Sequence, residues 1–325
     1  MKIPPLRLFL VVMAVGAVAW LTAATPAVTG LIRQVNGEVL LTSAATAGAF
    51  YRIDTSADLQ QWTPLVTVQS TGTDQFLDSA PPYLSRRFYR ATALTGTGLI
   101  TGDHLQTTAG DAILHPVNHA AVLVSWNGKF LYSDPGSTAS LYPALPRAHV
   151  IVVTHEHSDH FGNTVLASLL AADGVIFAPQ SVYTMMSSAM KARTTILANG
   201  ATGSAHGMGI RAVAMYNIPP GPINHAQGAG NGYVVTLGGQ NVYFSGDTED
   251  TPEMLALTGI DAAYVCMSLT SNMLPETAAS AVRQFRPRIV TPYHYRQGST
   301  TYDIALFKSI VGTDLGIEVR LRNFY

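Results

Sequence analysis

The sequence contains little cysteine and little charge. Cys266 is the single cysteine among 325 residues, so an intramolecular disulfide and a cysteine-rich structural zinc site are excluded. Charged residues make up 12% of the chain, and the net charge of −1 lacks the basic surplus typical of proteins that bind nucleic acids. The hydrophobic fraction is 47%, which with so few charges argues against disorder. We therefore expect a neutral globular protein whose length fits about two domains.

One long hydrophobic run is present, at the N-terminus. Lys2 and Arg7 precede an uncharged stretch over 8–24, and Thr22 and Ala24 suit the positions that a signal peptidase reads. We predict that 1–24 is a signal peptide and that the protein is exported, to the periplasm or the extracellular space. The alternative is an uncleaved anchor, and only then do we expect membrane contact; the run is at the short limit for spanning a bilayer. No cysteine follows it, which excludes a lipoprotein anchor.

Residues 28–94 have the composition of a small β-sandwich. Short segments rich in β-branched and aromatic residues alternate with glycine, proline and asparagine turns. The second half of the module resembles the fibronectin-like modules of exported bacterial proteins. Trp62, Tyr51 and Tyr89 could form a sugar-binding platform, but core packing is the interpretation we favour. Residues 95–98, Thr-Gly-Thr-Gly, fit a linker.

From residue 99 the pattern becomes α/β. Apolar strands alternate with helical stretches, so we expect sheets that are buried by helices outside them. Helical spacing is seen over 163–174 and over 275–285. The predicted strands are 120–126, 129–134, 149–154, 174–179, 232–237, 241–247, 262–268 and 288–294.

The chemistry-bearing residues follow these strands. Directly after an apolar strand the chain reads Thr154-His155-Glu156-His157-Ser158-Asp159-His160. Imidazoles and carboxylates gathered at a strand end are typical ligands of zinc and similar divalent metals. A polar surface loop is the alternative, but it does not account for this spacing.

This motif resembles the signature of the metallo-β-lactamase superfamily. Further segments are similar to the family's later motifs, in the same order: Asn224-His225, Ser245-Gly246-Asp247-Thr248 and Pro292-Tyr293-His294-Tyr295. The resemblance covers 99–325 and implies an αββα sandwich with a two-metal site at one edge, preceded here by the small all-β module.

The resemblance also implies the ligands. One metal ion would be held by His155, His157 and His225, and the second by Asp159, His160 and His294, with Asp247 shared between them. We expect two divalent ions, zinc being favoured and manganese or iron also accepted by such ligands. A hydroxide between the two ions would attack the substrate, and Asp159 and Asp247 would take part in catalysis, Asp159 by orienting that hydroxide.

Other residues near the motifs are candidates for a supporting role. We expect His119 to contact substrate or a ligand, Asp134 to hold a ligand loop or a ligand histidine, and Tyr293 to contact either the site or a developing oxyanion. His206 is the alternative to His225. Cys266 lies on an apolar strand and is interpreted as a buried small hydrophobic residue.

The predicted activity is hydrolysis of an ester, lactone or phosphodiester bond in a small molecule. Asp247 argues against the β-lactamases of the superfamily, which lack this bridging residue, and the similarity is greatest to the ascorbate-6-phosphate lactonase-like branch. No cluster of basic residues that could grip a phosphate stands near the motifs, so a phosphorylated substrate is not implied. Two other functions stay open: a non-catalytic metal-binding scaffold or adhesion module, and a di-iron redox protein.

Overall fold

The computed structural model describes residues 25–80, 86–221, 223–268 and 272–325. Its contacts divide the chain into two compact units, Met1–Gln106 and Thr107–Tyr325. This division falls later than the linker predicted at 95–98, and the limits predicted for the domains stay predictions. The predicted signal peptide, 1–24, lies outside the described residues. Within the described ranges no helix has the length and apolarity that crossing a membrane would require.

The first unit is built from β-strands alone over its described residues. One sheet has the order β1-β2-β5, and β7, β4, β3 and β6 pair in that order in another. Leu41, Tyr51, Ile53 and Tyr89 form its apolar core, which confirms the packing role expected for the two tyrosines. The strands are β1 (Ala27–Arg33), β2 (Val39–Ala44), β3 (Phe50–Ser56), β4 (Thr63–Gln69), β5 (Thr73–Asp78), β6 (Phe88–Leu94) and β7 (Gly102–Thr107).

The second unit holds two sheets. The strands of the first run in the order β13-β12-β11-β10-β9-β8 and those of the second in the order β14-β15-β16-β17-β18-β19-β22. The strands are β8 (Gly110–Asn118), β9 (Ala121–Trp126), β10 (Lys129–Ser133), β11 (Ala148–Val152), β12 (Leu170–Ala178), β13 (Thr194–Ile196), β14 (Thr202–Ala205), β15 (Met208–Met215), β16 (Gly230–Leu237), β17 (Gln240–Phe244), β18 (Ala262–Cys266), β19 (Ile289–Tyr293) and β22 (Glu318–Val319), with a small hairpin of β20 (Arg296–Gln297) and β21 (Thr300–Thr301).

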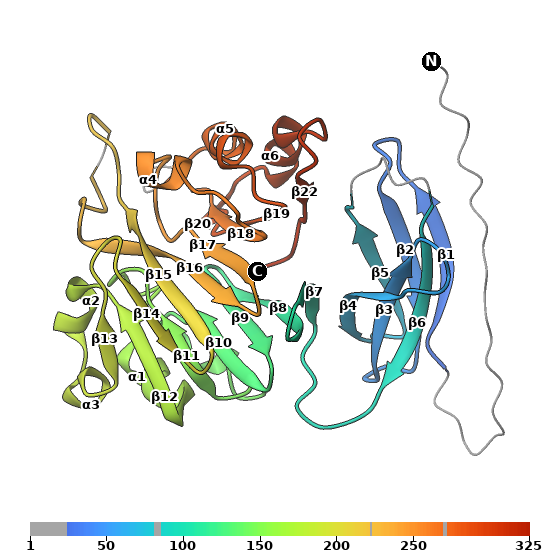
Figure 1. Ribbon diagram of the computed structural model, residues 1–325, viewed down its shortest axis with the longest axis horizontal. Helices are drawn as coiled ribbons and strands as arrows, with labels where there is room; N and C mark the ends of the chain where they lie inside the picture. Colours follow the sequence, from blue (N-terminus) through green and yellow to red (C-terminus); the bar gives the residue numbers. More distant parts are fainter. Residues whose placement is uncertain (1–24, 81–85, 222, 269–271) are drawn as a thin grey trace. The chain divides into compact units, whose positions relative to one another are not determined.

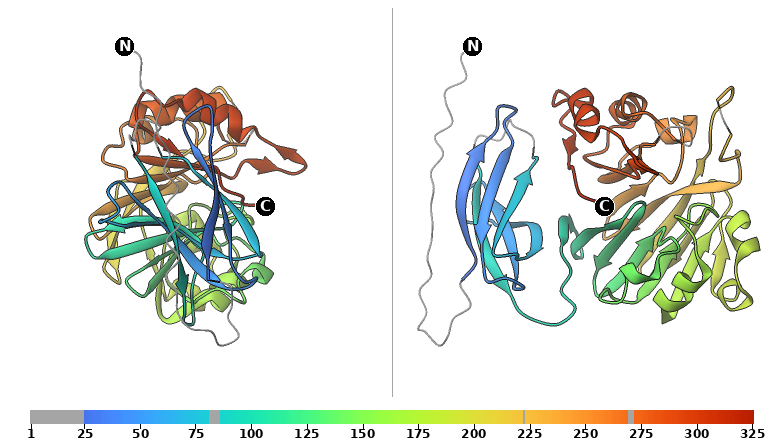
Figure 2. Two further views of the ribbon diagram at one scale, coloured as in Figure 1. Left: turned by 90° about the vertical axis from the view of Figure 1, so that its right-hand side faces the viewer. Right: turned by 180° about the vertical axis from the view of Figure 1, so that it is seen from behind.

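Helices cover the outer faces of these sheets. Figure 1 shows α4, α5 and α6 over the second sheet and α1, α2 and α3 along the first, and the reverse view in Figure 2 agrees. The αββα sandwich predicted from the sequence is thereby confirmed. The helices are η1 (Ala139–Leu141), α1 (Asn163–Leu169), α2 (Gln180–Met185), α3 (Ser188–Lys191), α4 (Pro252–Leu255), α5 (Pro275–Phe285) and α6 (Ile304–Val311).

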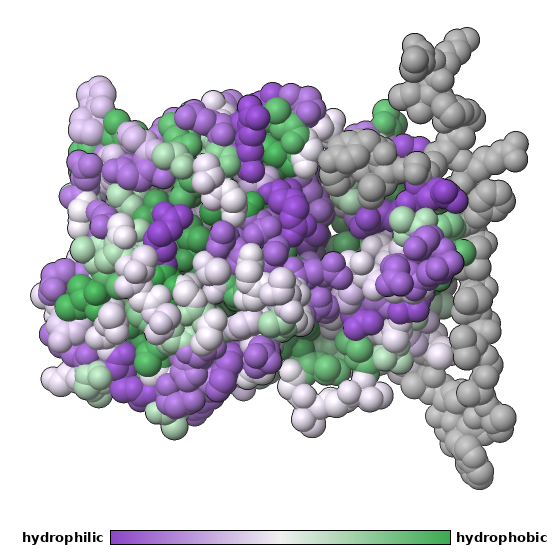
Figure 3. Space-filling model, viewed as in Figure 1, coloured by the Kyte–Doolittle hydropathy of each residue, from purple (hydrophilic) through white to green (hydrophobic). Residues whose placement is uncertain are grey.

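The strands supply most of the buried apolar surface of the second unit. β18 is buried along its whole length, and so is β19, as expected for strands enclosed between a second sheet and a helical layer. On the face seen in Figure 3, hydrophilic and apolar residues are interspersed over this unit. The apolar runs recognised in the sequence are therefore core strands.

The helix predicted over 163–174 is half as long as expected. α1 ends at Leu169, and the chain enters β12 at Leu170, which pairs with Ala148 of β11. The alanines and leucines at 169–172 are compatible with a helix or a strand, and the pairing with β11 favours the strand. The helix predicted over 275–285 is present with those bounds as α5.

The topology places the candidate motifs at one edge of each sheet. β10, β11 and β12 are parallel, as are β17, β18 and β19, so the residues that follow them lie at the same edge of their sheet. β9 and β16 are antiparallel to β10 and β17, so the residues that precede them lie at this edge as well. Every motif singled out in the sequence lies at one of these positions.

Candidate metal centre

The loop after β11 carries the densest group of candidate ligands. His155 and His160 are buried, whereas His157 and Asp159 are exposed. The loop turns back at His160, whose N–H donates to the carbonyl of His157 at 3.0 Å. This turn aims the histidine side chains into one space, as the spacing of the motif predicts.

Asp134, which follows β10, organises that loop from beneath. It is fully buried, and its Oδ1 accepts the Thr154 N–H at 2.8 Å. Its Oδ2 accepts both the Thr154 hydroxyl at 2.7 Å and His160 Nδ1–H at 2.9 Å. His155 Nδ1–H in turn faces Thr154 Oγ1 at 3.0 Å. One carboxylate thus orients two of the candidate ligands, so that their Nε2 atoms face the site.

His225 and His294 are oriented by oxygens from other segments. Asn217 Oδ1 accepts the His225 backbone N–H at 2.8 Å and faces its Nδ1 at 3.2 Å. Ser268 Oγ lies 3.3 Å from His294 Nδ1. Four imidazoles therefore have an oxygen at Nδ1, which leaves the Nε2 lone pair for a metal ion.

His157 faces the site with its other nitrogen. Its Nδ1 lies 3.1 Å from His155 Nε2 and 3.3 Å from His225 Nε2. These nitrogens can share a hydrogen bond in the metal-free protein, and their lone pairs are also close enough together to bind one cation. The three residues are one of the groups whose ligand atoms could hold one ion.

The second group of candidate ligands surrounds two carboxylates. Asp247 Oδ1 lies 3.4 Å from His160 Nε2, and Asp247 Oδ2 lies 3.3 Å from His294 Nε2. Asp159 Oδ2 lies 3.3 Å from His294 Nε2 and 3.6 Å from His160 Nε2. Asp247 Oδ2 is also 3.8 Å from His225 Nε2, so this carboxylate lies between the two groups.

These separations fit metal coordination. Ligand atoms placed at about 2.1 Å around a tetrahedral ion are about 3.4 Å apart, close to the distances between the nitrogens and oxygens of both groups. Within the described ranges His160 Nε2, His294 Nε2 and Asp247 Oδ1 are buried and have no hydrogen-bond partner. Buried polar atoms of folded proteins rarely lack a hydrogen-bond partner. The donor set of imidazole and carboxylate therefore fits divalent ions, and the residues present can hold them.

The charges of the site also favour a cation. Burial alone would raise the pKa of Asp247, but His294 and His160 outweigh it and hold that pKa well below its usual range. Burial also raises the pKa of Asp159, and the neighbouring imidazoles of His119 and His294 lower it to a greater extent. Burial, with a contribution from His160, lowers the pKa of His155. Ionised carboxylates and a neutral imidazole are the ligating forms at neutral pH.

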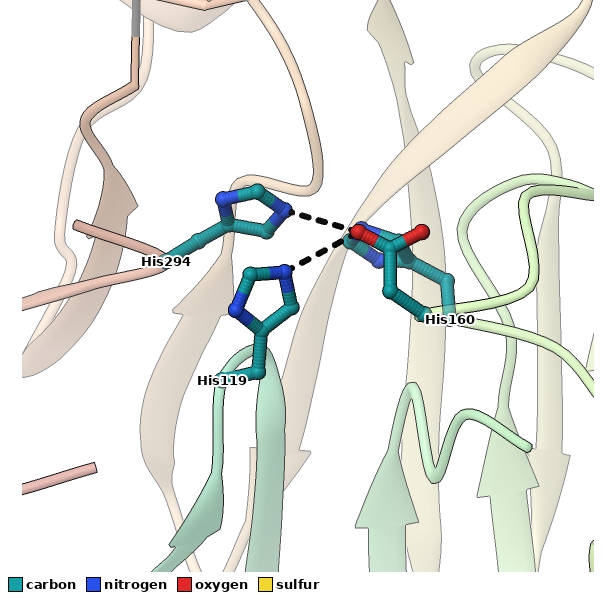
Figure 4. A group of neighbouring side chains, drawn as sticks. His119, His160 and His294 are labelled. Carbon is teal, nitrogen blue, oxygen red and sulfur yellow. Dashed lines mark hydrogen bonds and ion pairs between the residues drawn. The ribbon is translucent and has the colours of Figure 1, made fainter. Parts of the chain in front are cut away.

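His119 joins the site from the turn between β8 and β9. Its Nε2 lies 3.0 Å from Asp159 Oδ2, its Nδ1 lies 2.8 Å from the hydroxyl of Tyr325, and its ring packs 3.8 Å from that of His294. Figure 4 shows the rings of His119 and His294 directed at one carboxylate beside His160. The contact with a candidate ligand expected for His119 is thus present.

Backbone conformation is unusual at this edge. His119, Asp134 and His294 have φ values of 55°, 41° and 48°, a region that residues other than glycine rarely adopt. Such strain persists where the surroundings fix it and is often found at functional sites.

Tyr293 lies away from solvent. It is fully buried, and its hydroxyl accepts the Gly246 N–H at 2.9 Å, so it supports the turn that carries Asp247 and does not face the site.

His206 lies outside the cluster, with Nε2 3.0 Å from the carbonyl of Asp173. Cys266 is buried, and burial raises the pKa of its thiol to about 12, in agreement with a purely packing role.

Sequence reasoning missed the residues that orient two of the histidines. Asn217 and Ser268 follow no motif, and the structure alone brings them to His225 and His294. The one signal in the sequence was position, because each stands two residues beyond a strand, where polar side chains reach the same edge.

The comparisons with known proteins agree with this geometry. The family model described as β-lactamase superfamily domain matches residues 114–294. A UPF0173 metal-dependent hydrolase of Thermus thermophilus is 31% identical over 187 residues, covering 55% of this chain and 81% of the relative. The crystal structure of a proposed metal-dependent hydrolase from Parabacteroides distasonis has 32% identity and a TM-score of 0.60, covering 69% of this chain and 99% of the other. A metallo hydrolase from Ignicoccus hospitalis, Igni18, has 22% identity and a TM-score of 0.54, covering 64% and 94% of the two chains.

Proposed function

Because the chain belongs to the metallo-β-lactamase superfamily and is a metal-dependent hydrolase, we propose that it uses two divalent metal ions, zinc being favoured, to hydrolyse an ester, lactone or phosphodiester bond. The observation that supports two ions is the pair of ligand groups with Asp247 between them. The proposed ligands are His155, His157 and His225 for one ion and Asp159, His160 and His294 for the other, with Asp247 shared.

The metal ions, when bound, would polarise the carbonyl or phosphoryl oxygen next to the scissile bond and lower the pKa of a water molecule so that it can attack at neutral pH. The protein positions the reacting groups. Asp159 is held by His119 and stays ionised, because His119 and His294 keep its pKa low despite burial. Its side chain is 46% exposed, so a carboxylate oxygen can accept a hydrogen bond from the nucleophile and orient it toward the substrate.

The experiment that tests this proposal compares two histidines. We expect His157→Ala to lower turnover of a responsive substrate by more than about a hundredfold, since a lost ligand removes several kcal/mol of transition-state stabilisation. The matched control is His206→Ala, because His206 also follows a strand but lies outside both ligand groups. The substrates are a panel of lactones, aryl esters and bis-aryl phosphates, each assayed with and without a chelator.

The panel also separates the competing functions. Turnover that a chelator abolishes and added metal restores supports the hydrolase and identifies its bond class. Equal activity of the two variants contradicts the ligand assignment. Full metal binding with no turnover of any compound favours the scaffold or adhesion function, and iron with a visible absorption band favours the redox protein.

A further inference from the structure

A pocket of about 200 Å³ opens beside the candidate metal centre. It lies between the β8–β9 turn and the segment that follows β10, 135–142, and Asp159 belongs to both the pocket and the ligand groups. A molecule in this pocket therefore has one end next to the residues that would activate the nucleophile. The pocket is small beside the ~300–1,000 Å³ of drug-binding sites.

Polar side chains are among the residues that line the pocket. Ser137 and Thr138 are exposed, so their hydroxyls are accessible to a ligand as donors and acceptors. The Asn118 amide N–H donates to the carbonyl of Phe324 at 3.0 Å. Its amide oxygen is left as an acceptor. His119 contributes no further donor, because both its nitrogens are engaged by Tyr325 and Asp159.

Apolar surface also lines the pocket. Leu141 is half-buried and Tyr142 is buried, and the Tyr142 hydroxyl donates to the carbonyl of Pro135. Gly136 packs directly on the ligand loop, since a Cβ there would lie 2.7 Å from the carbonyl oxygen of Asp159, and its N–H donates to the carbonyl of His160 at 3.1 Å. The segment that shapes the pocket is thus in direct contact with the ligand loop.

The pocket offers no basic side chain to an anionic ligand group. None of its ten lining residues is lysine or arginine, so no side chain of the lining can form an ion pair with a phosphate or carboxylate group of the ligand. Hydroxyl groups, by contrast, can donate to Asn118 Oδ1 and exchange hydrogen bonds with Ser137 and Thr138.

The size of the pocket suits a small ligand group such as a single ring or its open-chain equivalent. Its volume of about 200 Å³ lies below the ~300–1,000 Å³ of drug-binding sites. A lining that holds both apolar and hydroxyl-bearing side chains suits a ring that carries hydrogen-bonding groups.

We propose that this pocket binds the uncharged, hydroxyl-bearing ring of the substrate, so that the protein hydrolyses small neutral hydroxylated lactones or esters in preference to phosphorylated ones. This inference rests on the proposed function for the bond that is cleaved, and on the pocket for the group that is recognised. Ser137 and Thr138 determine specificity in this account and do not take part in the chemical step.

The test uses the full-length, metal-loaded protein and a matched pair of substrates. D-Glucono-δ-lactone and δ-valerolactone contain the same ring ester with and without hydroxyl groups, and 6-phospho-D-glucono-δ-lactone adds a phosphate. Turnover is followed by pH-stat after subtraction of spontaneous hydrolysis. D-Glucono-δ-lactam, whose amide resists hydrolysis, measures binding alone by calorimetry.

The variants are Ser137→Ala/Thr138→Ala and, as the control, Ser140→Ala, an exposed serine of the same segment outside the pocket. We expect the double variant to raise KM for gluconolactone and Kd for the lactam by about three- to tenfold per lost hydrogen bond. The kcat values, the kinetics of valerolactone and all parameters of Ser140→Ala should not change.

The two proposals fail in different ways. An unchanged KM and lactam Kd in the double variant, no lactam binding to the wild type, or preference for the phosphorylated lactone each overturns the assignment of the pocket. Loss of lactam binding in the double variant, with no turnover of any lactone by the wild type, supports the pocket and contradicts the lactone or ester bond of the proposed function.

Discussion

At the scale of single residues, the orientation of the imidazoles depends on groups that are not ligands. Asp134 accepts three hydrogen bonds, from the backbone and hydroxyl of Thr154 and from His160. An amide in its place can accept at one end only, and its NH₂ group would face a donor. The geometry of the metal site therefore depends on the charge of a residue that no metal would touch.

We predict that Asp134→Asn lowers metal affinity by about 10- to 100-fold, the usual effect of removing the partner of a ligating histidine. The measurement is a competition titration with a zinc chelator. Asp173→Asn is the control, since Asp173 is 60% exposed and lies beside His206, away from the cluster. Equal affinity in the two variants would show that Asp134 does not orient the ligands.

A second prediction concerns protons. Burial alone would lower the pKa of His160, but Asp247 and Asp134 outweigh it and raise that pKa well above its usual value. These directions favour the protonated form of His160 and the neutral form of His155 in metal-free protein. With His160 as a ligand, as proposed, a bound metal ion takes the place of its proton.

We therefore expect zinc binding at pH 7 to release at least about one proton per chain. The measurement is calorimetry in buffers that differ in ionisation enthalpy. The number of protons released per bound ion should fall as the pH rises through the pKa of His160. Above that pKa, the imidazole of the metal-free protein has already lost its proton. Binding without proton release at pH 7 would contradict the assigned state of His160.

The sequence alone pointed to candidate ligands because imidazole and carboxylate side chains at strand ends form a short, dense pattern. His155, His157, Asp159 and His160 lie within six residues. The assignment of His225, Asp247 and His294 came from resemblance, and the structure brings all three to the cluster. Asn217 and Ser268 were beyond prediction, because a single acceptor has no pattern until the fold places it beside an imidazole.

At the scale of elements, the turn after β17 sets the position of Asp247. Gly246 has a φ of 62°, and a Cβ there would lie 2.6 Å from the sulfur of Met215 and 2.9 Å from Thr154 Cβ. The turn therefore requires glycine for conformation and for space. It also packs directly on the segment that carries the ligand loop.

We predict that Gly246→Ala lowers the free energy of unfolding by about 1–3 kcal/mol more than Gly259→Ala does. Gly259 is the matched control because its φ is 64° and a Cβ there would meet nothing within 4 Å. Chemical denaturation measures both variants. Equal losses would mean that the turn can shift, and that close packing does not fix Asp247.

The elements themselves were predictable to different degrees. Long apolar strands such as β9, and the amphipathic α5 with proline at its start, were recognised with nearly their observed bounds. The end of α1 was not, because Leu170 begins a strand only by pairing with β11. β15 was missed, since its glycine and arginine obscure the apolar pattern that its burial reveals.

At the scale of the whole molecule, the second unit contains every candidate ligand. The first unit has its own apolar core, and the sheet β1-β2-β5 lies wholly within it. Composition predicted two domains, because the β-rich and α/β segments differ in periodicity, and the limits assigned to them from the stretch 95–98 stay a prediction.

The predicted export is a property of the whole chain as well. We expect a cleaved protein whose first residue is near Thr25, because small residues follow the hydrophobic run there. Mass spectrometry of the protein from the culture medium or periplasm measures this. A chain that begins at Met1 and sediments with membranes would instead indicate a retained anchor.

The most direct test of the account is the metal content of protein purified without added metal, measured by elemental mass spectrometry. We expect about two divalent ions per chain, and fewer in His157→Ala. A chain that carries no metal and binds none on reconstitution would contradict the proposal that these seven residues form a two-metal centre.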